Sequence, residues 1–530
     1  MGDWGVRPVP TDLARRYRDE GWWNDDTVGR VLAEGLARQP DQRLLFFSDD
    51  RPFRGTFADG LTMAQRVAGA LAARGVRPGD PVAFQLPNHV EAAATFWGAA
   101  LLGAVVVPIV HFYGAKEVGY ILRQSEARVL VTAAGTGHLD HLAILDGLAP
   151  DLPALEHVLV VGDDAGRWEG FADAVDVAAP IVEPAATDPA APALIAYTSG
   201  TTADPKGVVH SHRTLGAEIR QLAALQPGHG RPTLTGAPVG HAIGMLGGLL
   251  LPVFRGEPIA MIDSWDPATI LRLMLEHDLT AGSGSTYFLL SLLEHPDFGD
   301  AHVRHMPAIG LGGSAVPAAI GERAAGLGIE TTRAYGSTEH PSTTGAHHSE
   351  PRAKRITTDG RPLAGVELCL DEDGEIWSRG PDLFSGYTDP QLTAEATDAD
   401  GWYRTGDIGV LDDEGWLTIT DRAKDVIIRG GENVSPAEVE GLLLRMPGVA
   451  EVAVVAAPDE RLGEHGCAFI RPTAGLAAPD LEAIRAHLEA AGLARQKWPE
   501  EIREVADLPR TATGKVQKFA LRAALRRPEG

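Results

Sequence analysis

Hydrophobic and polar positions follow two different periods along the first part of the chain. Over 61–75 the apolar residues recur with helical spacing, and Thr62 with Gln65 fits a capping box at the start of that helix. A Pro-Gly-Asp turn at 78–80 follows, and the apolar run after it predicts a buried strand over 82–86. The order is therefore helix, turn, strand.

The same order repeats further along the chain. Helical patterns at 90–102 and 116–124 alternate with β-branched runs at 105–107 and 128–132. Strands that alternate with helices of this length predict a parallel sheet covered by helices. The longest apolar stretch, 97–110, is too short to cross a bilayer as a helix.

The pattern changes twice in the second half. An Ala-, Pro- and Asp-rich connection at 179–192 leads back into α/β alternation over 194–345. Short strands separated by acidic turns then predict a β-rich unit over 365–421. A last unit mixes a strand at 449–456 with a helix at 479–491. A chain of 530 residues is expected to form more than one domain.

Composition narrows the class of function. With 44% hydrophobic residues the chain can bury a large core, and its formal charge of −25 argues against non-specific binding to nucleic acid or anionic membranes. The two cysteines, Cys369 and Cys467, indicate structural thiols rather than a metal site or a disulfide framework. The polar N-terminal stretch does not read as a signal peptide, so we expect a cytoplasmic protein.

The first segment with chemical meaning lies at 197–207, Tyr-Thr-Ser-Gly-Thr-Thr-Ala-Asp-Pro-Lys-Gly, directly after a predicted strand. Its hydroxyl and backbone N–H groups can donate to phosphate oxygens, and Lys206 adds a positive charge beside them. The spacing differs from that of a Walker loop. We therefore expect a phosphate-binding loop of another type.

This segment resembles the phosphate-binding signature of the adenylate-forming superfamily, which contains acyl-CoA synthetases, aryl-CoA ligases, beetle luciferases and adenylation domains. Four further segments are similar to motifs of that family and occur in its order: Tyr-Gly-Ser-Thr-Glu at 335–339, Gly-Trp-Tyr-Arg-Thr-Gly-Asp at 401–407, the hinge signature at 421–431 and the lysine motif at 509–515. Ala203 stands where most relatives have glycine. Ligases of the cyclohexanecarboxylate and medium-chain types look most similar.

The resemblance implies the fold and the reaction. The fold is α/β: a large N-terminal domain (1–422) of two doubly wound subdomains and a small β-rich one, followed by a mobile α+β domain (423–530). The reaction converts ATP and a carboxylic acid to acyl-AMP and pyrophosphate, and then passes the acyl group to coenzyme A. Three alternatives stay open: loading of a carrier protein, a luciferase-like oxygenase, and a family member that only binds.

The resemblance also implies the nucleotide site. Tyr335 should lie against adenine, Thr338 should contact the α-phosphate, Glu339 should hold Mg²⁺, and Asp407 should accept both ribose hydroxyls. Thr338, Glu339 and Lys515 are the expected catalytic residues, Lys515 acting where the acyl and phosphoryl groups meet. The full expected ATP site is Thr198, Ser199, Gly200, Thr201, Thr202, Lys206, Gly313, Ser314, Tyr335, Gly336, Thr338, Asp407, Arg422 and Lys515.

The second step requires a different arrangement, because Lys515 would occupy the approach of the thiol. The family rotates its C-terminal domain about a hinge, which corresponds to Lys424 here, and Gly431 should border the pantetheine passage.

The acyl pocket is expected at Gly240, His241, Gly244 and Gly312. Gly240 replaces the aromatic residue usual in the family, and His241 either lines the acyl channel or is a structural histidine. Further small residues in this part of the chain are Gly247, Gly248, the run 282–285 and Gly310. Small walls favour a bulky, branched or alicyclic acid. The absence of an acidic residue from 238–245 argues against an amino acid. The oligomeric state stays open, with a dimer as one option.

Overall fold

An eight-stranded sheet organises the first half of the chain, in a computed structural model that describes residue 4 and residues 6–137, 139–198, 205–225, 231–430, 432–459, 461–511 and 514–525. In spatial order its strands are β20 (Gly386–Tyr387), β11 (Lys206–Ser211), β10 (Pro192–Thr198), β4 (Val105–Ile109), β3 (Pro81–Gln85), β5 (Val129–Ala133), β8 (His157–Val161) and β9 (Glu169–Gly170). Neighbours from β10 to β9 are parallel, whereas β11 and β20 are antiparallel additions. The predicted parallel sheet is confirmed.

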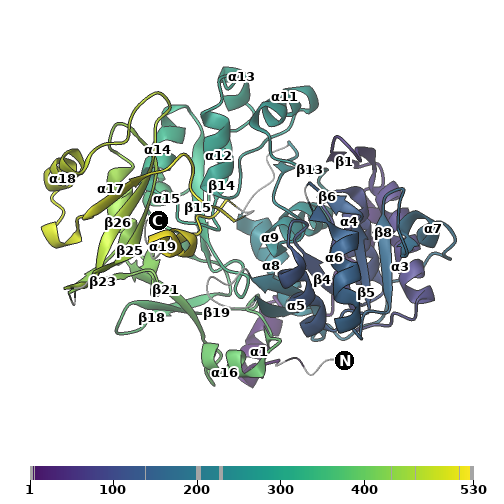
Figure 1. The fold of residues 1–530 in the computed structure, drawn as a ribbon. Coiled ribbons are helices and arrows are strands. Elements are labelled where there is room, and N and C mark those ends of the chain that lie inside the picture. Colours follow the sequence, from purple (N-terminus) through teal and green to yellow (C-terminus); the bar gives the residue numbers. More distant parts are fainter. Residues whose placement is uncertain are drawn as a thin grey trace.

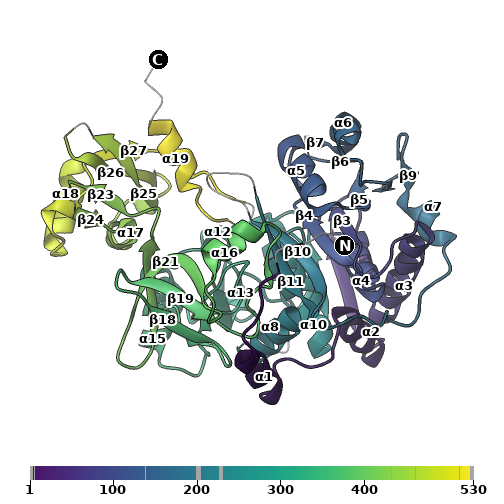
Figure 2. The same ribbon diagram turned by 90° about the horizontal axis from the view of Figure 1, so that it is seen from below.

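Helices cover both faces of this sheet (Figure 2). On one face lie α2 (Val28–Arg38), α3 (Phe57–Ala73), α4 (Val90–Leu101) and α7 (Phe171–Asp176), and on the other lie α5 (Ala115–Ser125) and α6 (His141–Leu148). The predicted start of α3 was wrong, because the capping box is formed by Thr56 and Asp59. Thr62 instead donates to the carbonyl of Ala58 within the helix.

The second α/β unit is built from two small sheets. Their strands are β12 (Leu234–Thr235), β13 (Ile259–Ile262), β1 (Arg43–Phe47) and β2 (Phe53–Thr56) in one, and β14 (Ala308–Leu311), β15 (Glu330–Tyr335), β16 (Thr344–Gly345) and β17 (Arg361–Pro362) in the other. Its helices are α11 (Pro267–His277), α12 (Thr286–Leu293), α13 (Asp300–Val303), α14 (Ala318–Gly326) and α15 (Arg352–Thr357). The preceding helical elements share the core of the first unit: α8 (His212–Leu225), α9 (Ala242–Met245), the π-helical turn η2 (Leu246–Leu250) and α10 (Leu251–Arg255). Strand β1 comes from the N-terminal segment, which local patterns do not reveal.

The β-rich unit and the C-terminal domain complete the chain. The first is the antiparallel sheet β18 (Glu367–Leu370), β19 (Glu375–Arg379), β21 (Tyr403–Leu411) and β22 (Leu417–Arg422), as predicted. The second contains β23 (Ile427–Arg429), β24 (Glu432–Val434), β25 (Val449–Asp459), β26 (Gly463–Pro472), β27 (Glu501–Glu504), α17 (Pro436–Leu443), α18 (Leu481–Ala490), η3 (Arg495–Lys497) and α19 (Lys518–Leu525). Smaller elements are α1 (Thr11–Asp19), β6 (Gly135–Thr136), β7 (Leu139–Asp140), η1 (Ala149–Asp151) and α16 (Pro390–Ala396). The C-terminal domain lies at the opposite end of the molecule from α3 and α7 (Figure 1).

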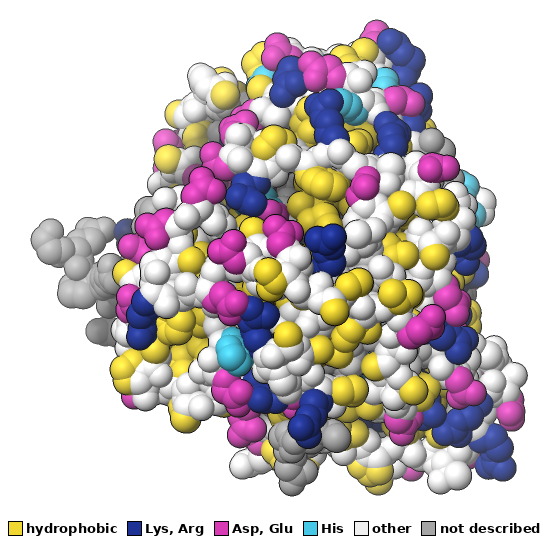
Figure 3. Space-filling view, turned by 90° about the vertical axis from the view of Figure 1, so that its right-hand side faces the viewer, with side chains coloured by type: hydrophobic (Ala, Val, Ile, Leu, Met, Phe, Trp, Pro, Cys, Tyr) yellow, Lys and Arg dark blue, Asp and Glu magenta, His cyan; other side chains and the backbone are white. Residues whose placement is uncertain are grey.

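The surface agrees with the composition. On the face that carries α3 and α7, acidic and basic side chains are interspersed and form no broad basic patch (Figure 3). Within the described residues, no helix is both long enough and apolar enough to cross a membrane.

Candidate active site

A buried carboxylate, Asp407 of β21, joins the central parts of the site. The Tyr335 hydroxyl at the end of β15 donates to Asp407 Oδ2 over 2.7 Å, and Arg422 Nε lies 2.8 Å from Oδ1. Asp407 is 3% exposed and pairs with Arg422 in the β21–β22 ladder. Burial and the neighbouring Asp407 charge raise the pKa of Tyr335 well above its usual value, so its hydroxyl stays protonated and donates.

The Thr338–Glu339 loop follows β15 and turns sharply. Gly336 is required there, because a Cβ atom would lie 1.9 Å from the carbonyl oxygen of Pro341. The Tyr387 hydroxyl donates to Glu339 Oε1 over 2.7 Å, and Lys206 Nζ lies 5.2 Å from the centroid of the Tyr387 ring. The end of the predicted phosphate loop and the predicted metal ligand therefore meet at Tyr387.

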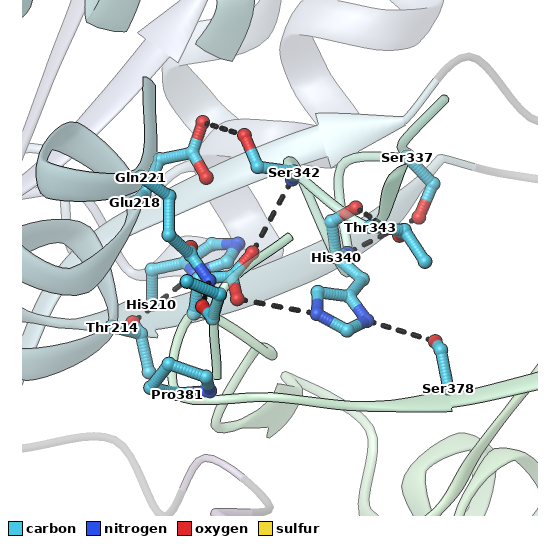
Figure 4. A network of polar contacts seen from close by, with 12 residues as sticks. His210, Thr214, Glu218, Gln221, Ser337, His340, Ser342, Thr343, Ser378 and Pro381 are labelled. Atoms are coloured by element: carbon cyan, nitrogen blue, oxygen red, sulfur yellow. Dashed lines mark hydrogen bonds and ion pairs between the residues drawn. The ribbon is translucent and has the colours of Figure 1, made fainter. Parts of the chain in front are cut away.

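A buried polar network holds this loop from behind (Figure 4). His340 contacts Ser378 Oγ through Nδ1 at 2.8 Å and Asp382 Oδ1 through Nε2 at 3.2 Å. Asp382 Oδ2 accepts from the backbone N–H of Ser342 at 3.3 Å, and Ser342 Oγ donates to Glu218 Oε1 at 2.9 Å. The imidazole and both carboxylates of this network lie inside the protein.

The network also shifts pKa values near the loop. Burial and the neighbouring Asp382 raise the pKa of Glu218 well above its usual value. His210 Nε2 lies 2.7 Å from the carbonyl oxygen of Thr338, and the tautomer with its proton on Nε2 donates to that oxygen. Burial lowers the pKa of His210 to about 4. The backbone of Thr338 is thus held by a neutral imidazole from β11.

The C-terminal lysine motif reaches the same site. Lys515 interacts electrostatically with Arg422, Asp407 and Lys424, and burial followed by the Arg422 charge lowers its pKa to about 8. The motif turns at Gly514, whose φ of +79° favours glycine. A Cβ atom at Gly514 would lie 2.6 Å from Ser285 Oγ, which shows how closely the motif packs on the N-terminal domain.

Two exposed ion pairs accompany this contact between the domains. Arg471 lies 3.6 Å from Glu294, and Arg445 lies 3.8 Å from Glu322.

The rest of the predicted nucleotide site lies around these groups, with one part outside the described residues. Thr198 ends β10, but Ser199, Gly200, Thr201 and Thr202 are not among the residues that the structure describes, and neither is Gly431. Gly313 has a φ of +73°, and a Cβ atom at Gly312 would lie 2.7 Å from the Ala334 carbonyl oxygen. Lys424 occupies an exposed turn between β22 and β23. The turn at 312–314 thus packs against the strand that carries Tyr335.

The interpretation of two glycines as open pocket wall was wrong. A Cβ atom at Gly240 would lie 2.5 Å from Val110 Cα, and one at Gly244 would lie 2.2 Å from the Pro238 carbonyl oxygen. These glycines allow backbone segments to pack, so the missing side chains do not open volume at these positions. His241 precedes α9, and burial lowers its pKa to about 4, so this half-buried imidazole is neutral at pH 7.

Metal binding must rely on few protein ligands. Within the described residues no three side chains of the His, Cys, Asp and Glu types converge as a metal site. Glu339 is one carboxylate beside the phosphate-loop lysine, which suits Mg²⁺ that takes its other ligands from phosphate oxygens and water.

Comparison with known proteins decides the family. The sequence profile of the AMP-binding enzyme family matches residues 32–388, and that of the AMP-binding enzyme C-terminal domain matches residues 438–515. The chain belongs to the AMP-binding enzymes.

Its curated relatives include ligases that use coenzyme A. The chain is 39% identical over 518 residues to the 3-[(3aS,4S,7aS)-7a-methyl-1,5-dioxo-octahydro-1H-inden-4-yl]propanoyl:CoA ligase of Mycobacterium tuberculosis, covering 94% of this chain and 99% of the relative. It is 31% identical over 525 residues to the medium-chain fatty-acid–CoA ligase of Escherichia coli, and the match covers 96% of this chain and 92% of that relative.

Solved structures agree with this membership. The anthranilate CoA ligase AuaEII with anthranoyl-AMP superposes with a TM-score of 0.85 at 25% identity, over 96% of this chain and 98% of that one. ATP-bound MatB from Rhodopseudomonas palustris superposes with a TM-score of 0.82 at 27% identity, over 94% of this chain and 99% of that one.

Several residues of this AMP-binding enzyme escaped the sequence analysis. Tyr387 lies in a two-residue strand that joins the large sheet from far along the chain, and Asp382 lies in a loop without a pattern. His340 offered the only local signal, because it directly follows the Tyr-Gly-Ser-Thr-Glu motif.

Gly240→Ala should destabilise the enzyme without changing its preference among acids. The added methyl group must displace the backbone at Val110, and such overpacking typically costs about 1–3 kcal/mol. Gly247→Ala is the matched control, because an added Cβ there would meet no atom within 4 Å and alanine favours a helix. Melting temperatures and relative activities on small and large acids test this; a changed acid preference in a stable Gly240→Ala variant would contradict it.

Asp382→Ala should lower stability strongly, because it leaves His340 and the Ser342 N–H buried without their partner. Each buried polar group left without its partner costs about 1–3 kcal/mol. Asp373→Ala, an exposed acid in the β18–β19 turn, is the control and should change little. Thermal unfolding measures both, and equal melting temperatures would show that the network does not stabilise the fold.

Proposed function

We propose that this AMP-binding enzyme activates a bulky carboxylic acid and that the groups around Asp407, Glu339 and Lys515 carry the first step. The reaction is that of an AMP-forming acyl-CoA synthetase: ATP and the acid give acyl-AMP and pyrophosphate, and coenzyme A then takes the acyl group and releases AMP. The observation that supports the residue roles best is the entry of Lys515 into the charged group of Asp407 and Arg422.

Asp407 and Tyr335 would bind the nucleoside. A carboxylate has about four acceptor sites, so Asp407 can accept two ribose hydroxyls in addition to the bonds from Tyr335 and Arg422. The Tyr335 ring would then lie against adenine, with the turn of Gly312, Gly313 and Ser314 beyond it.

The triphosphate would lie between the phosphate loop and the Thr338–Glu339 loop. Lys206 begins β11, and His210 of the same strand contacts the Thr338 carbonyl oxygen. Strand β11 therefore connects the end of the phosphate loop with the Thr338–Glu339 loop. Glu339 would hold Mg²⁺ together with phosphate oxygens, and Tyr387 would keep that carboxylate oriented.

Lys515 would neutralise charge where the carboxylate attacks the α-phosphorus. The carboxylate oxygen forms a bond to that phosphorus while the bond to the pyrophosphate oxygen breaks, so negative charge moves towards pyrophosphate. A cation placed beside this centre stabilises the transition state more than the ground state.

The second step would need Lys515 to leave. The exposed turn that holds Lys424 suits a hinge between residues 1–422 and 423–530. The turn lies between the two regions that match family profiles, because the first region ends at residue 388 and the second begins at residue 438. Gly431 directly follows Gly430, whose φ is +58°. We propose that Gly431 borders the pantetheine passage.

Support for a bulky acid comes from the relatives. The relative that is 39% identical is named for a fused-ring propanoic acid with two ketones, and another is named for a hydroxylated naphthoate. This argument replaces the one from Gly240 and Gly244, since the missing side chains do not open volume at those positions.

A panel of acids tests the function directly. Cyclic, fused-ring and linear acids would be incubated with ATP and Mg²⁺, and pyrophosphate release measured with coenzyme A, with a carrier protein or with neither. We expect release with cyclic acids and thioester formation with coenzyme A. Thioester formation only on the carrier protein would change the acceptor, and no release with any acid would refute the proposed activity.

Lys515→Ala should slow acyl-AMP formation while leaving thioester formation from supplied acyl-AMP largely intact. Removing a group that stabilises the transition state typically costs about 10²- to 10³-fold. Lys497→Ala, which removes an exposed lysine of the same domain, is the matched control. Single-turnover rates of the two half-reactions measure this, and an equal loss in both would contradict the assigned role.

The first half-reaction should weaken as pH rises through about 8. The pKa of Lys515 is lowered to about 8, so the side chain is charged below this pH and neutral above it. The profile of kcat/KM for ATP reports groups of the free enzyme, so it should fall there. Lys515→Arg keeps its charge and should lack this fall; a wild-type profile that is flat between pH 7 and about 9.5 would contradict the prediction.

A further inference from the structure

Three histidines gather at one edge of the large sheet, outside the site described above. His89 follows β3, His111 follows β4 and His141 follows β5, and these three strands are adjacent and parallel. Their carboxyl ends therefore lie side by side. Strand β10, which leads into the phosphate loop, is parallel to β4 and ends at the same edge. Ligands of open α/β sheets bind at this edge.

A fourth histidine joins them from the predicted acyl segment. The backbone of Gly240 packs on Val110, which places the following residue, His241, beside His111. Asn88 fixes this approach: it donates to the Ala237 carbonyl over 3.1 Å and accepts from the Val239 N–H over 2.9 Å. The electrostatic partners of His111 are accordingly the other three histidines and Asp263. We call His89, His111, His141 and His241 the histidine cluster.

The cluster offers ring nitrogens that the protein itself does not use. His89 Nε2 lies 3.3 Å from Asp263 Oδ2 and His141 Nδ1 lies 3.4 Å from Thr132 Oγ1. Among the described residues, no hydrogen-bond partner meets the buried atoms His89 Nδ1 and His111 Nδ1. The ring of His141 instead bonds backbone carbonyls of His111 and Ala133, and it is 1% exposed, whereas His89 is 7% exposed. Each buried polar atom left unpaired costs about 1–3 kcal/mol, so the two unpaired nitrogens indicate a place where a ligand supplies the bonds.

The charge of the cluster restricts that ligand. Burial lowers the pKa values of His111 and His241 to about 4, so both rings are neutral at pH 7. Burial tends to raise the pKa of Asp263, but hydrogen bonds from His89 and Ser48 lower it below its usual value. A carboxylate therefore lies next to His89. A neutral imidazole has one donor and one acceptor nitrogen. His111 and His241 therefore suit a neutral oxygen.

We propose that the histidine cluster binds a neutral oxygen function, a ketone or a hydroxyl, at the end of the acyl group remote from the reacting carboxylate. This inference rests on the proposed function. From β10, the strands β4, β3 and β5 lie one, two and three spacings of about 4.8 Å away, or about 5 to 14 Å, a range that the ring oxygen of a cyclic or fused-ring acid reaches and acetate does not. The preferred substrates are therefore oxygenated ring acids.

Matched pairs of acids test the proposal: 3-(4-oxocyclohexyl)propanoate, 3-(4-hydroxycyclohexyl)propanoate and 3-cyclohexylpropanoate, together with fused-ring keto acids and their deoxygenated forms. Pyrophosphate release gives kcat/KM for each. Wild type should favour an oxygenated acid over its deoxygenated form by about tenfold or more, because a site built for hydrogen bonds rejects a group that lacks them. Separate keto and hydroxyl arms identify which oxygen is bound.

His111→Leu and His141→Leu should remove this preference by lowering kcat/KM for the oxygenated acid while sparing its deoxygenated form. Because Nδ1 of His111 has no hydrogen-bond partner, replacing His111 by leucine should cost little free energy of folding. The melting temperature of His111→Leu should therefore stay level or rise. His157→Leu is the matched control, because His157 starts β8 at the opposite edge of the same sheet.

The outcomes separate this inference from the proposed function. If wild type activates deoxygenated acids as well as oxygenated ones, or if His111→Leu lowers both equally in a folded protein, the cluster does not bind the acyl oxygen although the enzyme remains a ligase. If no acid releases pyrophosphate, the proposed function itself fails.

Discussion

Burying a carboxylate costs free energy unless donors and cations surround it, and Asp407 meets this condition only when separate parts of the chain come together. Tyr335 reaches it from one sheet, Arg422 from the neighbouring strand, and Lys515 from the C-terminal domain. Lys424 and Asp425 also act on Lys515, so three cations (Arg422, Lys424 and Lys515) face two carboxylates (Asp407 and Asp425) at this point. The site thereby attracts an anionic nucleotide, and the phosphates of that nucleotide would favour the protonated form of Lys515.

The two halves of this assembly are held with unequal strength. The Thr338–Glu339 side is fixed by buried bonds from His210, His340 and Tyr387, all of which join residues of the N-terminal domain. Such satisfied networks are rigid because any displacement leaves a buried polar group unpaired. The groups proposed to position the nucleotide therefore belong to the rigid domain, while Lys515, the cation proposed to come and go, belongs to the other.

Local patterns predicted what is local. The strands around Val82, Val106 and Val129 are fully buried on both faces and read as apolar runs, and the acidic turns of the β-rich sheet indicated its strands. The motifs singled out Tyr335, Asp407, Arg422 and Lys515 by residue type at fixed spacing, and the structure brings these four residues together. What failed depended on distant packing: the capping box of α3, the strand β1 in the second unit, and the glycines at 240 and 244, whose neighbours are backbone atoms. Sequence shows that a residue is small but does not show what fills the space beside it.

In the proposed mechanism one lysine serves the first of two steps and then leaves, so the contacts between the domains would have to break between the steps. The pairs Arg471–Glu294 and Arg445–Glu322 lie at the surface, where an ion pair contributes about 0–1 kcal/mol. Lys515 itself is repelled by Arg422 and Lys424, so leaving the site relieves part of the cost of holding it there. The proposed mechanism would exchange two domain orientations through the differential binding of ligands. ATP and the acid, which bring negative charge, would favour the orientation with Lys515 inside. After pyrophosphate has left, much of that charge would be gone, and a thiol-bearing acceptor would favour the orientation with Lys515 outside.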